Sequence, residues 1–167
     1  GAGHLHASGS ADGRTCRSHQ RVGPGEYLHG DPAAGNSRTS GGSLSQRILL
    51  IEDNPQNRYL VSFLLEAAGW EMVHAEDGPT GVRLAREVDP ALILLDIQLP
   101  GMDGYAVARA LRSDRRLDAV PIVAVTSYAM AGDRERCLVA GCSGYIEKPI
   151  DPQTFVLQVE RFMQKRP

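Results

Sequence analysis

Residues 92–104 read LILLDIQLPGMDG, and this stretch decides the fold of the chain. Four aliphatic residues in succession, Leu92 to Leu95, are typical of a strand that is buried on both faces of a parallel sheet. The run ends on the carboxylate of Asp96, and Pro100-Gly101 then turns the chain into a loop. Asp96 is therefore expected at the carboxyl end of a central strand, where open α/β sheets bind their ligands.

A second aliphatic run, Ile48 to Ile51, also ends in acidic residues, Glu52 and Asp53. Two parallel strands of this kind would bring three carboxylates to one edge of a sheet. Like charges that lie so close together need a cation, and an all-oxygen site that keeps some of its water suits Mg²⁺. The sequence thus predicts an anionic Mg²⁺ pocket at this edge.

Strand and helix patterns alternate outward from these two runs. The expected strands are 47–51, 71–75, 92–96, 121–126 and 144–147. The expected helices are 55–68, 77–88, 103–112, 132–140 and one that begins at Pro152 after the cap residue Asp151. This alternation predicts a doubly wound (βα)5 parallel sheet of flavodoxin-like order 2-1-3-4-5, in which the more polar second strand lies at an edge. Apolar spacing predicts an inward face of Leu60, Phe63, Leu64 and Ala67 in the first helix, and of Phe155, Val159, Phe162 and Met163 in the last.

Composition points to one globular domain with an appendage. The chain has 167 residues, 42% of them hydrophobic, and a net charge of −2, which gives no electrostatic reason to expect nucleic-acid binding. No apolar run reaches the length of a membrane span and no signal peptide is visible, so we expect a cytoplasmic protein without membrane insertion. The three cysteines, Cys16, Cys137 and Cys142, have no disulfide-framework spacing and are expected to be reduced thiols.

Residues 1–45 form a separate block that is rich in Gly, Ser and His. We expect this tail to be disordered because it has too few large apolar residues to offset its chain entropy. The spacings of its histidines match no standard metal-ligand pattern, so a solvated tail is favoured over a metal site. The chain has no initiator Met, which an expression scar or the linker end of a longer protein would explain. The folded domain is then expected to span residues 46–167.

Two further polar residues end later strands, Thr126 after the run 121–126 and Lys148 after 144–147. Together with the three acids they supply metal ligands, a carboxylate nucleophile, a hydroxyl and a fixed cation. Such a set can handle a phosphoryl group, because the carboxylate attacks phosphorus while the cations and the hydroxyl bind the phosphoryl oxygens.

Four motifs make residues 47–166 resemble the receiver domain of two-component signalling, a CheY-like member of the response-regulator superfamily. The motifs are LIEDN at 50–54, LLDIQLPGMDG at 94–104, VAVT at 123–126 and YIEKP at 145–149. The stretch AVTSYAMAGD at 124–133 makes the chain most similar to single-domain regulators of cell-division kinases or to the receivers of hybrid kinases.

The resemblance implies a role for each residue at the predicted pocket. Asp96 would accept a phosphoryl group from a partner's phosphohistidine. Asp53 would bind Mg²⁺ directly, together with the Asp96 carboxylate and the backbone carbonyl of Gln98. Glu52, where many receivers have Asp, would support the metal through water.

Further roles follow from the same resemblance for residues on the fourth and fifth strands. Thr126 would bond a phosphoryl oxygen, Lys148 would pair with the phosphoryl group, and Tyr145 would swing inward when Thr126 moves. The peptide bond before Pro149 would be cis. Asp103 is interpreted as a helix cap rather than a pocket acid, and a surface or packing role is expected for His74.

The predicted function is a phosphorylation-dependent switch in a bacterial two-component system or phosphorelay. The chain is expected to catalyse no reaction other than its own phosphorylation and autodephosphorylation. A sensor histidine kinase or histidine phosphotransferase would be the donor. A downstream regulatory protein would bind the face made by the fourth helix, the fifth strand and the fifth helix. The chain is expected to be a monomer, with dimerisation on phosphorylation as a further option. Because the chain ends at Pro167, soon after the fifth helix, no DNA-binding or catalytic output segment is expected, and the output would be protein contact or onward phosphotransfer. The alternative is the C-terminal receiver of a hybrid histidine kinase in a phosphorelay.

Three other classes fit the residues less well. Phosphohydrolases with an aspartyl nucleophile usually carry a second Asp two residues later, where this chain has Gln98. A nucleotide- or flavin-binding module would need a Gly-rich phosphate loop after the first strand, where this chain has acids. A degenerate receiver would not need the complete set of acids, Thr and Lys.

Overall fold

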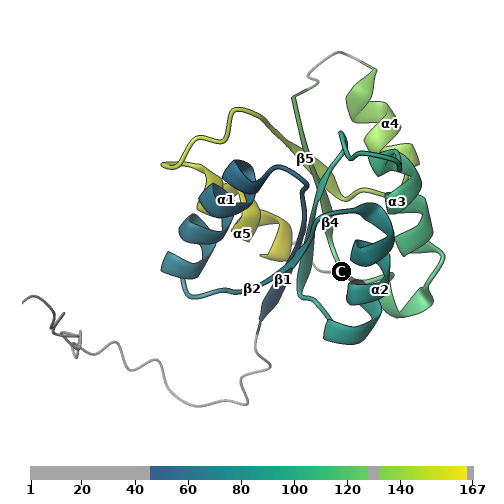
Figure 1. The fold of residues 1–167 in the computed structure, drawn as a ribbon, viewed down its shortest axis with the longest axis horizontal. Coiled ribbons are helices and arrows are strands. Elements are labelled where there is room, and N and C mark those ends of the chain that lie inside the picture. The colour runs from purple at the N-terminus through teal and green to yellow at the C-terminus, as the bar shows by residue number, and fades with distance from the viewer. Residues whose placement is uncertain (1–45, 128–131, 165–167) are drawn as a thin grey trace, which may run out of the picture. The chain divides into compact units, whose positions relative to one another are not determined.

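The computed structural model describes residues 46–127 and 132–164. Strands and helices alternate through them (Figure 1). The strands are β1 (Arg47–Ile51), β2 (Glu71–Ala75), β3 (Leu92–Asp96), β4 (Ile122–Thr126) and β5 (Gly144–Glu147). The helices are α1 (Pro55–Ala67), α2 (Gly78–Val88), α3 (Gly104–Arg112), α4 (Asp133–Val139) and α5 (Phe155–Gln164), with a short 3-10 helix η1 (Arg115–Leu117). The predicted tail, residues 1–45, lies outside the described residues.

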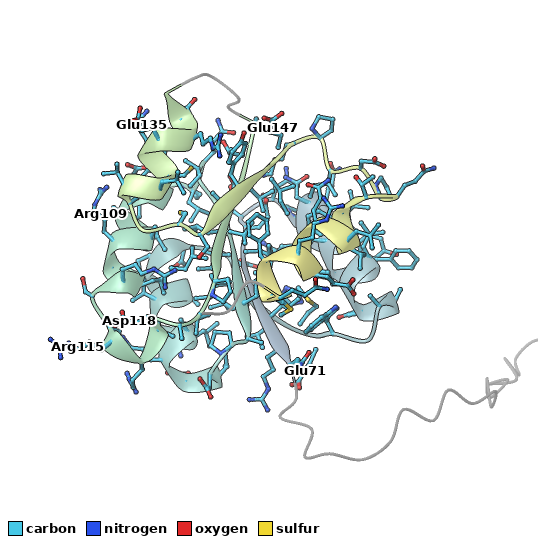
Figure 2. All side chains as sticks on the ribbon, turned by 180° about the vertical axis from the view of Figure 1, so that it is seen from behind. Glu71, Arg109, Arg115, Asp118, Glu135 and Glu147 are labelled. Atoms are coloured by element: carbon cyan, nitrogen blue, oxygen red, sulfur yellow. The ribbon has the colours of Figure 1, made fainter. Side chains whose placement is uncertain are left out.

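All five strands are parallel and run in the order β2-β1-β3-β4-β5, which confirms the predicted flavodoxin-like topology. The register pairs Ile51 with Leu95, Asp96 with Val125, and Thr126 with Glu147. The carboxyl ends of β1, β3, β4 and β5 therefore lie within two residues of one another along the strands. Figure 2 shows Glu147, at the end of β5, and Glu71, at the start of β2, near opposite ends of the strands.

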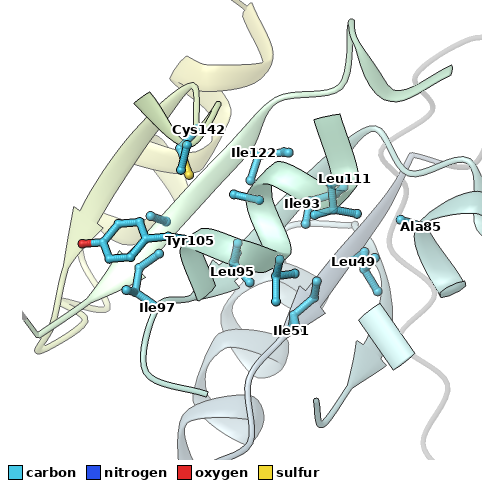
Figure 3. Close-up of a cluster of buried hydrophobic side chains, with 14 of the residues drawn as sticks. Leu49, Ile51, Ala85, Ile93, Leu95, Ile97, Tyr105, Leu111, Ile122 and Cys142 are labelled. Atoms are coloured by element: carbon cyan, nitrogen blue, oxygen red, sulfur yellow. The ribbon is translucent and has the colours of Figure 1, made fainter. Parts of the chain in front are cut away.

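Helices cover both faces of the sheet, with α1 and α5 on one side and α2, α3 and α4 on the other (Figure 1). The strand alternation divides the core accordingly. Leu49, Ile93 and Leu95 pack with Leu111 and Ala85 on the α2–α4 side, part of which Figure 3 shows. The other face buries Ile48, Leu50, Leu92 and Leu94 against Val61, Leu65, Phe155 and Val159 of α1 and α5. Both faces of the central strands are thus closed, and only their ends reach solvent.

The predicted face of α1 is wrong in part. Val61 and Leu65 are the buried residues of this helix, whereas Phe63 is 59% exposed and Ala67 is exposed. Apolar residues lie on more than one face of α1, so their spacing alone leaves the rotation of the helix open. The turn at Asn54, whose side chain caps the helix, and the packing on the sheet select the Val61–Leu65 face.

Helix boundaries also differ from the prediction, by one residue in α1 to α4 and by more at the start of α5. The α5 helix begins at Phe155 rather than at Pro152, because residues 151–154 form a turn in which the Asp151 carboxylate accepts from the Gln153 amide. The predicted inward residues Phe155 and Val159 are buried, and Phe162 and Met163 pack against the same cluster. The α4 helix spans Asp133–Val139, one residue shorter at each end than predicted. None of the helices in the described ranges 46–127 and 132–164 is long and apolar enough to cross a membrane.

Candidate functional site

The ends of β1 and β3 bring together the three acids that the sequence predicted at this edge. Glu52, Asp53 and Asp96 each present a carboxylate oxygen, and these oxygens all lie within 4.8 Å of one another. Glu52 and Asp96 are only 2% and 3% exposed, whereas Asp53 is exposed. The cluster is therefore a buried anionic pocket with one wall that is open to water.

Lys148 reaches this pocket from the end of β5 and pairs with two of the acids. Its Nζ donates to Asp96 Oδ2 at 2.7 Å and to Glu52 Oε2 at 2.8 Å, and its side chain is 13% exposed. The Lys148 backbone amide donates to the Thr126 carbonyl at 2.8 Å, which holds the lysine beside the end of β4. The Lys148–Pro149 peptide bond is cis. One cation thus bridges carboxylates from two strands.

Burial and neighbouring charges shift the pKa values of Glu52 and Lys148. Burial raises the pKa of Glu52, and the negative charge of Asp96 adds to the rise, while the Lys148 and Asn57 hydrogen bonds oppose it. Burial alone would lower the pKa of Lys148, but its hydrogen bonds to Asp96 and Glu52 outweigh that effect and leave the pKa raised. Lys148 is therefore a permanent cation at neutral pH.

Residues at the start of α1 donate hydrogen bonds to Glu52 and to the backbone of Asp53. Asn57 Nδ2 donates to Glu52 Oε1 at 3.1 Å, and the Asn54 amide donates to the same oxygen at 3.3 Å. Arg58 Nη1 donates to the backbone carbonyls of Glu52 at 2.9 Å and Asp53 at 3.0 Å. Sequence reasoning missed Asn57 and Arg58, although their place one helical turn after the acids was the available signal.

The loop after β3 is shaped around Asp96. The Gln98 amide donates to Asp96 Oδ1 at 2.8 Å, so both carboxylate oxygens of Asp96 have a donor. Asp103 caps α3 by accepting from the Tyr105 amide at 3.1 Å, as expected of a helix cap. A Cβ on Gly104 would lie 2.6 Å from the Asp96 carbonyl oxygen, so only glycine permits this close approach of α3 to the loop.

The remaining predicted residues lie on three different strands. Thr126 ends β4 and is 2% exposed. Tyr145 of β5 is half-buried against the core cluster on the α2–α4 side of the sheet. His74 is exposed on the edge strand β2, where it pairs with Leu50 of β1.

The donor set of the pocket fits Mg²⁺. It consists of carboxylate oxygens, with no histidine or cysteine in the cluster, and hard divalent cations prefer such oxygens. Lys148 balances only part of the charge of three acids, and the exposed side at Asp53 leaves room for the water ligands that Mg²⁺ retains.

Comparisons with known proteins agree with this geometry. Residues 48–160 match the response regulator receiver domain family. Over 120 residues the chain is 39% identical to the polar-differentiation response regulator DivK of Brucella ovis, covering 72% of this chain and 98% of that protein.

Solved structures of receiver domains are also similar to this chain. The receiver domain of the sensor histidine kinase PA1611 from Pseudomonas aeruginosa, which has a magnesium ion in its active-site cleft, is 36% identical with a TM-score of 0.67, over 72% of this chain and 99% of that one. The chemotaxis protein CheY4 of Vibrio cholerae is 26% identical with a TM-score of 0.67, over 70% of this chain and 97% of that one. The chain therefore belongs to the response regulator receiver domain family of two-component systems.

Proposed function

We propose that this chain is a signalling switch that accepts a phosphoryl group on Asp96 from a histidine kinase or histidine phosphotransferase. The observation that carries the proposal is the position of Lys148, whose Nζ bridges Asp96 Oδ2 and Glu52 Oε2 inside a pocket of three acids. A buried lysine beside a strand-end aspartate provides a nucleophile together with a fixed cation for the oxygens of the incoming group.

The transfer would make one bond and break one. An Asp96 carboxylate oxygen attacks phosphorus, and the bond between phosphorus and the donor's histidine nitrogen breaks, which returns the electron pair to the imidazole. Mg²⁺, held by Asp53, Asp96 and the Gln98 carbonyl with Glu52 acting through water, would neutralise charge on the phosphoryl oxygens. Lys148 would move from its two carboxylates to pair with those oxygens.

Phosphorylation in the pocket would then change the surface of the chain. The Thr126 hydroxyl donates to a phosphoryl oxygen, Tyr145 repacks, and the face made by α4, β5 and α5 changes its affinity for a downstream regulatory protein. In this proposal the chain works in the cytoplasm and turns over nothing except its own phosphoaspartate. Dimerisation on phosphorylation is compatible with the same face.

The identity to DivK favours a single-domain regulator as the setting for this switch. The 36% identity to the receiver of a sensor histidine kinase supports the alternative, a receiver of a hybrid kinase that works in a phosphorelay. The two settings differ in where the phosphoryl group goes next. Incubating the phosphorylated chain with a histidine phosphotransferase separates them, because a phosphorelay receiver loses its label to that protein.

The test of the acceptor is the Asp96→Asn variant, incubated with acetyl phosphate and Mg²⁺ and separated on a gel that retards phosphoproteins. The proposal predicts a retarded band for the wild-type chain and none for Asp96→Asn. The matched control is Asp103→Asn, an acid of the same loop that caps α3, and it should still be labelled. Equal labelling of Asp96→Asn and wild type would show that another residue is the acceptor.

A further inference from the structure

The Glu52 carboxylate is held by a side chain that the proposed mechanism does not use. Asn57 Nδ2 donates to Glu52 Oε1 at 3.1 Å, while Lys148 holds Oε2 at 2.8 Å. A carboxylate only accepts hydrogen bonds, so Asn57 must turn its NH₂ group and not its carbonyl oxygen toward Glu52. With the Asn54 amide at 3.3 Å, the two oxygens of this buried group have three donors.

Helix preferences do not explain an asparagine at this position. Asn57 is the third residue of α1, after the N-cap Asn54 and the N1 residue Pro55. Glutamate is favoured there, because it completes a capping box and complements the helix dipole, whereas asparagine is a weak helix former. The first turn of α1 has no acidic residue. An acid at position 57 would face the Glu52 carboxylate and repel it.

Glu52 also needs a support that an aspartate would not need. Its side chain has one more rotatable bond, so its carboxylate can point in more directions from the same backbone position. Arg58 fixes the backbone by donating to the carbonyls of Glu52 and Asp53, but these bonds leave the side-chain torsions free. The orientation of the carboxylate is left to the donors on its two oxygens, and Asn57 is the side-chain donor on Oε1.

We propose that Asn57 is a positioning residue that holds Glu52 in the orientation in which it supports Mg²⁺. This inference rests on the proposed function in so far as it places Mg²⁺ at the acidic pocket. It predicts that the affinity of the chain for Mg²⁺ depends on Asn57, and that this dependence passes through Glu52. Removing an outer partner that orients a metal-binding group typically lowers metal affinity by about 10-fold or more.

The experiment titrates MgCl₂ into the full chain and follows the Gln98 amide by nuclear magnetic resonance, since this amide donates to Asp96 in the pocket. Four proteins form a double-mutant cycle: wild type, Asn57→Ala, Glu52→Gln, and the variant with both changes. Gln56→Ala, an exposed neighbour on the same turn, is the matched control. Unfolding curves of each variant without metal verify that it folds.

The inference predicts a Kd for Mg²⁺ that is about 10-fold higher in Asn57→Ala, unchanged in Gln56→Ala, and no higher in the double variant than in Glu52→Gln. An unchanged Kd in Asn57→Ala would overturn the inference. So would an increase in Kd on Asn57→Ala that is the same in the wild-type and the Glu52→Gln backgrounds. A wild-type chain that binds no Mg²⁺ would also overturn it. If Mg²⁺ binds as predicted while acetyl phosphate leaves Asp96 unlabelled, the proposed function fails and the role of Asn57 stands.

Discussion

Lys148 is the residue that makes the pocket compatible with folding. Removing one partner from a buried ion pair typically costs about 3–5 kcal/mol, because the remaining charge is left without compensation. Here a single lysine compensates Asp96 and Glu52 at once, while Asp53 adds a third negative charge within 4.8 Å. The pocket therefore carries repulsion between acids that a further cation would relieve. Such local cost is expected where function, rather than stability, selects the residues.

This repulsion predicts that Asp53→Asn stabilises the chain when no metal is present. The substitution removes a negative charge next to Glu52 and Asp96, and two charges about 4 Å apart in water interact by about 1 kcal/mol. We expect urea unfolding in EDTA to give a free energy of unfolding about 1 kcal/mol higher than in the wild type. Addition of Mg²⁺ should stabilise the wild type and leave Asp53→Asn nearly unchanged, because ligands stabilise only the state that binds them.

The control for this prediction is Asp118→Asn, which removes an exposed acid just after η1 (Figure 2). Its stability should not differ from that of the wild type in either buffer. If Asp53→Asn were less stable than the wild type in EDTA, the pocket would not be under electrostatic repulsion.

At the residue scale, the sequence predicted those site residues that stand directly after a strand. The acids follow aliphatic runs and Lys148 follows the strand Gly144–Glu147, so their convergence could be predicted from the parallel order of the strands. Asn57 and Arg58 could not be found in this way. Their contacts depend on the rotation of α1 about its own axis, and the predicted face of that helix was wrong in part.

At the scale of elements, the approach of α3 to the β3 loop depends on Gly104. A Cβ there would lie 2.5 Å from the Ile97 Cα and 2.6 Å from the Asp96 carbonyl oxygen. Both are backbone atoms that cannot rotate away, so Gly104→Ala should destabilise the chain by about 2–3 kcal/mol, as overpacking does. Urea unfolding measures the loss. Gly132→Ala, where the added Cβ meets nothing within 4 Å, should cost far less; equal losses would contradict the close approach.

The short helix η1 is tied to α2 through Asp114, which predicts a pH dependence. Asp114 accepts from the Arg116 amide at 3.1 Å and pairs with Arg116 at 2.7 Å and Arg86 at 3.3 Å. The Arg116 side chain is the main cause that lowers the pKa of Asp114 from 3.8 to about 2. A lowered carboxyl pKa adds stability above the unfolded value, and this stability is lost as the pH falls toward the folded value.

Asp114→Asn should therefore be less stable than the wild type at about pH 6, and the difference should shrink as the pH falls from about 4 toward 2. Urea unfolding of both proteins across this range measures the difference. A gap that stays constant down to the lowest pH at which both proteins fold would show that the Asp114 carboxylate does not supply this stability.

Element boundaries show what local patterns can and cannot predict. Cap and proline signals placed the start of α1 at Pro55, where the Asn54 side chain accepts from two amides. The same signal at Asp151-Pro152 predicted a helix, but a turn precedes α5 there. Both segments begin with a polar cap residue followed by a proline. Packing of Phe155 against the core decides where the second one becomes helical.

At the scale of the whole molecule, the order of the strands creates the pocket. β1 and β3 are neighbours although α1, β2 and α2 separate them in sequence, and the strands beside β3 are β1 and β4. The aliphatic character of β1 and β3 predicted this central position, since strands buried on both faces leave no polar face for solvent. The topology could thus be predicted, because strand hydrophobicity and the short βα connections agree with each other.

The most direct test of the account is a crystal structure of the full chain grown with Mg²⁺ and beryllofluoride, a mimic of the phosphoryl group. The account predicts beryllofluoride bonded to an Asp96 carboxylate oxygen, with Lys148 Nζ and the Thr126 hydroxyl on its fluorines and Mg²⁺ among Glu52, Asp53 and Asp96. Beryllofluoride on another side chain, or a lysine that stays on the two carboxylates while Mg²⁺ binds elsewhere, would contradict it.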